Sequence, residues 1–392
     1  MATSGMWKLI HLFGRLFGDK LYVFPYKIST SNKQMLLVRN MSRSRRCFHV
    51  FGITCVVCHT LFCFACLCQP FFSKKHQKGS IPDLEESDAV KVVRVYVQIL
   101  SALFPPSFFG MNYVITFMQV IPEIILCKIA GFQKETQELT ATKTIHSYFI
   151  VELGMRLMIW VTFMLPLPVA IIAVYVQIDP LHVLMGGSSN GNKIIITLTR
   201  SIITLIVVYE SVTAVTAYFI IGLMMICSMT DILQDLRESN HTHNLVRRLQ
   251  EINLYKKMFL WNKYTNQNFC SFSVPPLIFF GISVVVLTYY GTIRIWGKVG
   301  FFLYMVLPSI SVLSTFFVIM MIPHAAMVFE FAEKFIACRL NGANVSKFER
   351  KTWKSMRPVG IQVGVFGSVK KSLKMLAFKY IAESTINLLL AF

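Results

Sequence analysis

The sequence predicts an all-α membrane protein with seven transmembrane helices, a cytoplasmic N-terminus and an extracellular C-terminus. Hydrophobic residues make up 55% of the 392 residues and charged residues only 15%, a balance typical of polytopic membrane proteins. A bilayer core of about 30 Å needs roughly 20 apolar residues per helix, and stretches of this kind recur along the chain. We expect membrane spans at residues 47–72, 96–127, 146–176, 194–228, 272–291, 301–323 and 368–392.

Basic residues crowd alternate loops, and this alternation predicts the orientation. The N-terminal segment 1–46 has nine Lys or Arg residues against one acid. The loop 177–193 has a single basic residue, whereas the loops 229–271 and 324–367 have six and seven. By the positive-inside rule the crowded segments are cytoplasmic. The net charge of +20 is therefore explained by topology, and we expect no nucleic-acid partner.

The first 18 residues have an amphipathic pattern. Trp7, Ile10, Phe13 and Phe17 fall near one face of a helix. This pattern is typical of a helix that lies at the inner membrane surface. The first span that follows holds six of the ten cysteines, some at C-x-x-C spacing. Inside a membrane helix we expect these cysteines to act as small apolar residues rather than zinc ligands.

Prolines interrupt two of the spans. Pro105 and Pro106 should kink the second span, and Pro166 and Pro168 should break the third. The 229–271 loop has apolar residues at helical spacing on both sides of a polar break at 239–244. We therefore expect two cytoplasmic helices there rather than a simple turn.

Charged residues inside the third and fourth spans are candidates for function. Glu152 and Arg156 are four residues apart, which predicts an intrahelical ion pair. Arg200 and Glu210 are isolated charges in the fourth span. Charged residues inside a membrane helix belong to a functional site, or else they pair across helices to stabilise packing. Both interpretations stay open at this point.

The final stretch, residues 366–392, combines an apolar helix of membrane-spanning length with a polar flank. Lys379, Glu383, Thr385 and Asn387 lie on that flank. Polar groups in hydrocarbon are costly, so such a flank faces protein or a water-filled path. The pattern predicts a pore-lining helix. Lys379 and Glu383, one turn apart, form either a local ion pair or a cytoplasmic vestibule.

This architecture resembles that of the insect chemoreceptor superfamily, which comprises gustatory and odorant receptors. Gustatory receptors typically end in Thr-Tyr, five apolar residues and Gln-Phe, and residues 384–392 read STINLLLAF. The spacing and Phe392 agree, whereas Ser384, Thr385 and Ala391 replace Thr, Tyr and Gln. The run RPVGIQVGVFGSVKKSLKML before it also resembles the family.

The resemblance implies a ligand-gated, non-selective cation channel in the plasma membrane, opened by a small organic tastant. It implies a homotetramer, or a heterotetramer with related subunits, with a pore lined by residues 368–392. The transmembrane blocks would be 47–228 and 272–323, and the loops 229–271 and 324–367 would form a cytoplasmic anchor. No cofactor is implied.

The resemblance also assigns roles to particular residues. Asn387 would supply a polar ring in place of the glutamine that Ala391 replaces, and Leu388 with Ala391 would complete the gate. Lys379 and Glu383 would form the pore vestibule. For a ligand pocket in the outer half of the bundle, we select Arg200, Tyr289, Tyr290 and Tyr304.

Two other classes of protein compete with the channel. A seven-span signalling receptor coupled to a cytoplasmic partner would need an extracellular N-terminus. A transporter or membrane enzyme would use Glu152, Arg156, Arg200 and Glu210 as a buried relay. The sequence has no phosphate-binding loop, no H-E-x-x-H motif and no nucleophile elbow, so we expect no enzyme.

Overall fold

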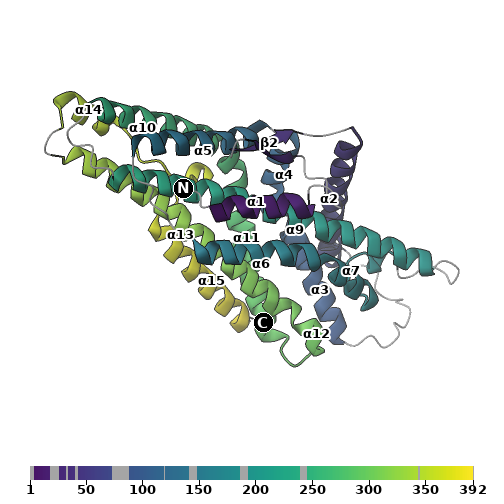
Figure 1. Cartoon of the computed structure of the whole chain (residues 1–392). Coiled ribbons are helices and arrows are strands. Elements are labelled where there is room, and N and C mark those ends of the chain that lie inside the picture. The colour runs from purple at the N-terminus through teal and green to yellow at the C-terminus, as the bar shows by residue number, and fades with distance from the viewer. Residues whose placement is uncertain are drawn as a thin grey trace.

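The computed structural model describes residues 4–17, 26–31, 34–39, 43–72, 88–118, 120–140, 148–185, 193–238, 245–342 and 345–391. In these ranges the chain forms a bundle of helices, as predicted, with one small hairpin (Figure 1). Strands β1 (Tyr26–Ser31) and β2 (Gln34–Arg39) pair antiparallel, with Tyr26 opposite Arg39. These strands lie in a basic leader without clear periodicity, and they were not predicted from the sequence.

Among the described residues, five helical segments are long and apolar enough to cross a membrane: Cys47–Gln69, Val92–Val114, Lys193–Glu238, Leu245–Arg294 and Val306–Leu340. The bent pair of α6 (Phe149–Met164) and α7 (Pro166–Tyr175) makes a possible sixth span. The predicted seventh span is helix α15 (Lys371–Ala391). It has three charged side chains among its last 18 residues and is not in this group. Seven crossings and the orientation of the termini therefore stay predictions.

The two breaks fall at the predicted prolines. Helix α3 (Asp88–Leu103) ends before a 3-10 turn, η1 (Pro105–Phe108), and the chain continues as α4 (Phe109–Phe117) and α5 (Val120–Leu139). Helix α7 begins at Pro166 and is bent by 45° from α6. Proline lacks a backbone N–H and clashes with the preceding turn, so a straight helix cannot pass through it without strain.

Helix α9 (Lys193–Glu238) is the centre of the bundle. Residues 213–233 of this helix are all buried, as expected for a helix that is apolar all round. It packs against α2 (Arg43–Phe72), α5, α6, α7 and α13 (Val306–Leu340). Phe219 of α9 stacks on Phe317 of α13, with ring centroids 3.8 Å apart.

Helix α1 (Ser4–Phe17) packs against the protein with its apolar face, and its position at the inner membrane surface stays a prediction. Its apolar face is buried against α6 and α9 and consists of Met6, Leu9, Ile10, Phe13 and Phe17. Phe17 meets Phe163 edge-on, and Gly5 leaves room for the carboxylate of Glu152. An apolar helix face can be covered by protein as well as by lipid, and the sequence pattern does not distinguish the two.

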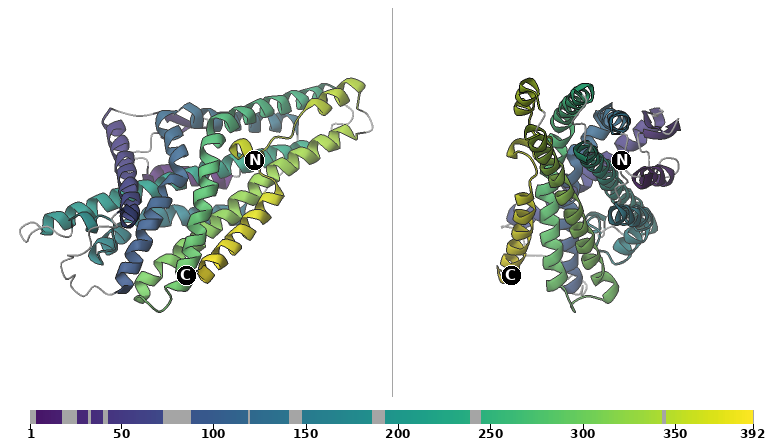
Figure 2. Two further views of the ribbon diagram at one scale, coloured as in Figure 1. Left: turned by 180° about the vertical axis from the view of Figure 1, so that it is seen from behind. Right: turned by 60° about the vertical axis from the view of Figure 1, so that its left-hand side comes forward.

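One end of the bundle is formed by the long helices that the sequence predicts to be cytoplasmic. Helix α10 (Leu245–Thr265) continues through a π-helical turn, η2 (Asn266–Cys270), into α11 (Ser271–Arg294). The ring of its Tyr255 lies 5.6 Å from the rings of both Phe335 of α13 and Trp353 of α14 (Lys347–Ser355), measured between centroids, and those two rings are 5.4 Å apart. The opposite end carries α12 (Phe301–Tyr304) and the C-terminal end of α15 (Figure 2).

Candidate functional site

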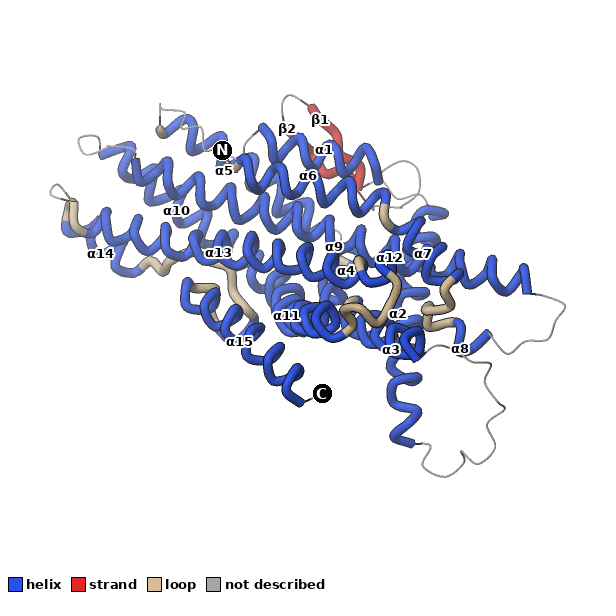
Figure 3. Tube along the Cα trace, turned by 90° about the horizontal axis from the view of Figure 1, so that it is seen from below, coloured by secondary structure: helices blue, strands red, loops and turns tan. Residues whose placement is uncertain are grey.

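Helix α15 lies at the edge of the bundle, against α11 and α13 (Figure 3). One face is packed: Ala377, Ile381 and Thr385 are buried. The remaining surface carries exposed apolar side chains, namely Met375, Leu376, Tyr380, Ile386 and Leu390. The packed face holds α15 to its own chain, and the exposed face is open to lipid or to another chain.

The predicted gate residues point in different directions. Asn387 and Ala391 are exposed and lie one turn apart on the open side of α15. Leu388 is half-buried and packs against a cluster that includes Val285 and Val286 of α11. Asn387 and Ala391 are therefore available to line a path outside this chain, whereas Leu388 takes part in the packing that holds the helix.

Lys379 and Glu383 form the local ion pair that their spacing predicts. The Lys379 Nζ lies 3.6 Å from a Glu383 carboxylate oxygen, and the two side chains are 68% and 59% exposed. Asn387 follows Glu383 at the same four-residue spacing, so the three side chains form one polar stripe on the open face. If α15 spans the membrane as predicted, this polar stripe would need water or protein beside it.

Two neighbouring tyrosines of α11 contact different parts of the bundle. Tyr289 packs against the cluster that α11 shares with α15, and its hydroxyl lies 2.8 Å from the Thr315 hydroxyl of α13. Tyr290 packs against a second cluster, which is called the outer cluster because it lies in the half of the bundle that is predicted to be extracellular. This cluster consists of Val93, Tyr96, Ala173, Ile178, Ile295 and Leu307. The structure therefore places Tyr290 among the helices of the predicted pocket, and Tyr289 beside α15.

Tyr304 is buried near the same end of α11. Its hydroxyl donates a hydrogen bond to the Thr292 carbonyl at 3.0 Å, and its ring meets Trp296 edge-on at 4.9 Å. In the outer cluster, Tyr96 accepts a hydrogen bond from the Gly291 amide at 3.0 Å. These contacts tie the short turn after α11 to the helices around it.

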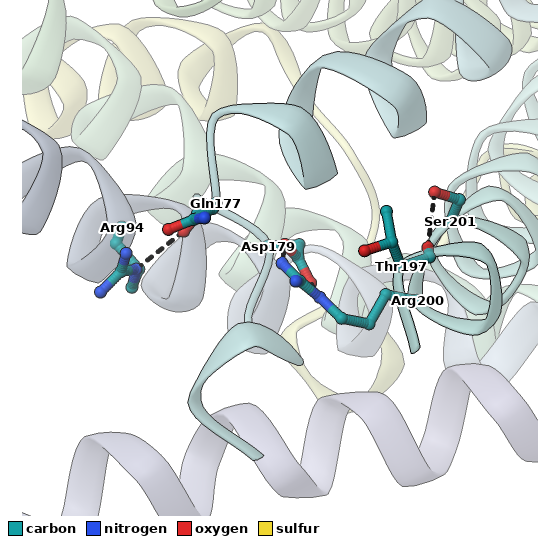
Figure 4. A network of polar contacts seen from close by, with 6 residues as sticks. All are labelled: Arg94, Gln177, Asp179, Thr197, Arg200 and Ser201. Carbon is teal, nitrogen blue, oxygen red and sulfur yellow. Dashed lines mark hydrogen bonds and ion pairs between the residues drawn. The ribbon is translucent and has the colours of Figure 1, made fainter. Parts of the chain in front are cut away.

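Arg200 is buried and bound to an acid that lies in the loop after α7. Its Nε donates to one carboxylate oxygen of Asp179 at 3.0 Å, and a terminal nitrogen donates to the other (Figure 4). Asp179 is fully buried, and its neighbour Ile178 belongs to the outer cluster. A second arginine, Arg94 of α3, donates to the Gln177 carbonyl at 2.9 Å. Two arginines from α3 and α9 thus hold the loop beside the outer cluster.

The other isolated charge of α9 also has a partner. Glu210 lies 3.3 Å from Nδ1 of His49 in α2, and both side chains are buried. Gly52 of the same helix leaves room for the Glu210 carboxyl group, 3.1 Å from where a Cβ would lie. Of the two interpretations left open by the sequence, pairing across elements therefore describes both Arg200 and Glu210.

The fold resembles that of an insect olfactory receptor. The structure of olfactory receptor OR5 from Machilis hrabei is similar over 99% of each chain, with a TM-score of 0.64 and 14% sequence identity. The same receptor in complex with eugenol is similar over 99% of this chain and 98% of that chain, with a TM-score of 0.55 and 11% identity. No protein-family model and no curated protein matches the sequence.

Asp179 and Arg94 were not among the residues predicted from the sequence, although one signal pointed to Asp179. Asp179 is the only acid in the predicted 177–193 loop, and Arg200 is the only basic residue in the first three turns of the span that follows. Pairing the single opposite charges across that loop would have found the contact. No comparable signal identifies Arg94, because its partner is a backbone carbonyl.

Proposed function

We propose that this chain is a chemoreceptor subunit that acts as a ligand-gated, non-selective cation channel in the plasma membrane. The observation that carries the proposal is the open face of α15, with its stripe of Lys379, Glu383 and Asn387. The likeness of the fold to olfactory receptor OR5 supports it.

The cost of charge in hydrocarbon favours a pore over a lipid-facing helix. A Lys or an Asp near the centre of a membrane helix costs about 2.5–3.5 kcal/mol on insertion scales. In a tetramer with α15 facing the central axis, the stripe would meet water, while Ala377, Ile381 and Thr385 would stay packed against the same chain. Asn387 and Ala391 would then form the narrow outer part, and Lys379 with Glu383 the vestibule.

The ligand of this proposal is a small, largely apolar organic molecule. Tyr290 and Tyr304 lie where α11 meets the outer cluster, and the Arg200–Asp179 pair borders that cluster. Such a site has an apolar body with a few polar groups that orient a ligand. The C-terminal run 384–392 supports the finer assignment to a gustatory-type receptor, opened by a tastant.

Recording from cells that express this chain alone tests the proposal. We expect a panel of small organic compounds to evoke cation currents, and Asn387→Asp to raise calcium permeability relative to sodium by placing a ring of carboxylates in the pore. Asn387→Ala should lower calcium permeability relative to sodium, because it removes the amide oxygen. Thr199→Val is the matched control, because Thr199 is exposed on α9 and, within the described part of the chain, its hydroxyl donates to the Ile195 carbonyl of the same helix.

Two outcomes would count against the proposal. One is that no member of a broad panel evokes current although the chain reaches the surface. The other is that currents appear but the Asn387 substitutions leave ion selectivity as unchanged as Thr199→Val does.

A further inference from the structure

The long helix formed by α10 and α11 has a weak region at residues 266–276, where its regular backbone hydrogen bonds are interrupted. The π-helical turn η2 widens the helix at Asn266–Cys270, and such turns are frequent at functional sites. Pro275 and Pro276 follow within the next two turns and remove two backbone donors. In a regular helix the Phe272 carbonyl would accept a hydrogen bond from the amide of residue 276, which proline lacks. Here the Phe272 carbonyl lies against Gly110 of α4, so close that a Cβ at position 110 would clash with its oxygen. Helix bending is therefore easiest in this region.

Asn266, the first residue of η2, bridges this weak region to another part of the chain. Its amide nitrogen donates to the Gly360 carbonyl at 2.8 Å, and its amide oxygen accepts from the Gln362 N–H at 3.1 Å. The side chain is buried, with the residue only 3% exposed. Gly360 and Gln362 are two residues apart, so the Asn266 amide pairs with this extended segment as a neighbouring strand would.

The segment that Asn266 binds leads directly into α15. Val359, Ile361 and Val363 alternate inward and are buried, as in a strand. The Val363 amide donates to the Gly367 carbonyl and the Val369 amide to the Ile361 carbonyl, both at 2.8 Å, which closes a hairpin. Two residues after Val369, α15 begins.

The hairpin also touches the proline pair. Gly364 has a φ of +51°, in the left-handed region that favours glycine, and a Cβ there would lie 3.2 Å from the Pro275 ring. The hairpin is therefore held at two points of the weak region, by hydrogen bonds at Asn266 and by contact at Pro275.

We propose that Asn266 is a positioning residue that couples movement of α11 about its π-helical turn to the start of α15. Helix α11 contacts the outer cluster through Tyr290, so a ligand that shifts α11 would move the hairpin through Asn266. The inference rests on the proposed function in assuming that α15 lines a pore; the contact itself is independent of that assumption.

The contact is tested first by hydrogen exchange on the purified full chain in lipid nanodiscs. The Gln362 amide should be protected in the wild type and should exchange faster in Asn266→Ala and in Asn266→Leu, which keeps the side-chain size. Asn268→Ala is the matched control in the same turn, since its amide donates to the Tyr264 carbonyl within the helix. Unchanged protection of Gln362 in both Asn266 variants would overturn the bridge.

The coupling is tested by concentration–response recording together with direct ligand binding. The probe is the compound of the panel that evokes the largest wild-type current. We expect the Asn266 variants to shift its half-maximal concentration by about 5- to 150-fold, the range of ordinary coupling between sites. Ligand binding in the presence of a closed-pore blocker should change little, and Asn268→Ala should match the wild type. Where Asn266→Ala does not reach the surface, Asn266→Asp, which keeps the shape and the acceptor, decides the question.

The two ideas fail in different ways. If the wild-type chain gives no current, the channel proposal is contradicted. Hydrogen exchange at Gln362 then decides by itself whether Asn266 binds the hairpin. A responsive wild type whose Asn266 variants lose protection at Gln362, yet keep the wild-type concentration–response curve, would overturn the coupling while sparing the channel.

Discussion

Tyr289 of α11 and Leu388 of α15 pack against the same small apolar cluster, built on Val285, Val286 and Ile381. The residue after Tyr289, Tyr290, packs against the outer cluster instead. Helix α11 therefore contacts the candidate ligand region with one face and the candidate pore helix with another. If the proposed ligand changes the position of α11, the change would have a direct physical route to α15 through packed side chains.

Tyr289→Phe should weaken the response to ligand while preserving the fold. The substitution keeps the ring in its cluster and removes the hydrogen bond to Thr315, worth about 0.5–1.5 kcal/mol. We expect a shift of the concentration–response curve, with a similar shift for Thr315→Val. In the double variant the two shifts should not add, because both remove one bond. Additive shifts would show that the two hydroxyl groups act separately.

Gly291→Ala should destabilise the protein. A Cβ at Gly291 would lie 2.6 Å from the Tyr96 ring, and forcing extra volume into a packed site costs about 1–3 kcal/mol. Gly281→Ala in the same helix is the control, since no atom lies within 4 Å of its added Cβ. The melting temperature in detergent should fall for Gly291→Ala and stay the same or rise for Gly281→Ala. Equal melting temperatures would contradict the packing of Tyr96 on α11.

Arg200→Met should destabilise the protein more than a double substitution that removes both Arg200 and Asp179. It leaves Asp179, which is fully buried, without its bidentate partner, and breaking such a pair costs about 3–5 kcal/mol. Arg200→Met with Asp179→Leu should recover much of the loss, because no buried charge remains. Melting temperature and surface expression measure both. A double variant less stable than Arg200→Met alone would show that the charges do more than neutralise each other.

Glu383→Lys should reduce single-channel cation conductance with little effect on stability. The Lys379–Glu383 pair is exposed and contributes little to folding, but in a pore its carboxylate would attract cations. Glu383→Gln should give an intermediate conductance. Glu138→Lys makes the same charge change at an exposed position of α5 and is the control. If Glu383→Lys and Glu138→Lys conduct alike, α15 does not face the ion path.

Local chemistry explains what could be predicted before the structure. Apolar runs indicated most of the long helices, and Pro105 and Pro166 indicated where two of them break. The spacing of Lys379 and Glu383 predicted their ion pair. These features depend on neighbours within one or two turns, so sequence spacing is sufficient to find them.

The remaining parts of the candidate site depend on contacts between distant segments. Asn266 meets Gly360 and Gln362 across almost a hundred residues, through backbone groups that carry no sequence signature. The opposite roles of Tyr289 and Tyr290 follow from which helices flank α11.

The sequence by itself determined that this is a multi-helix membrane protein whose last helix combines an apolar body with a polar stripe, because hydropathy and charge are properties of the residues themselves. Only the tertiary structure decided which face of α15 is packed, that Arg200 is bound to Asp179, and that Asn266 ties α11 to the start of α15. Those outcomes depend on how long helices pack side by side. That packing is set by complementary shapes and by backbone partners that a linear pattern does not encode.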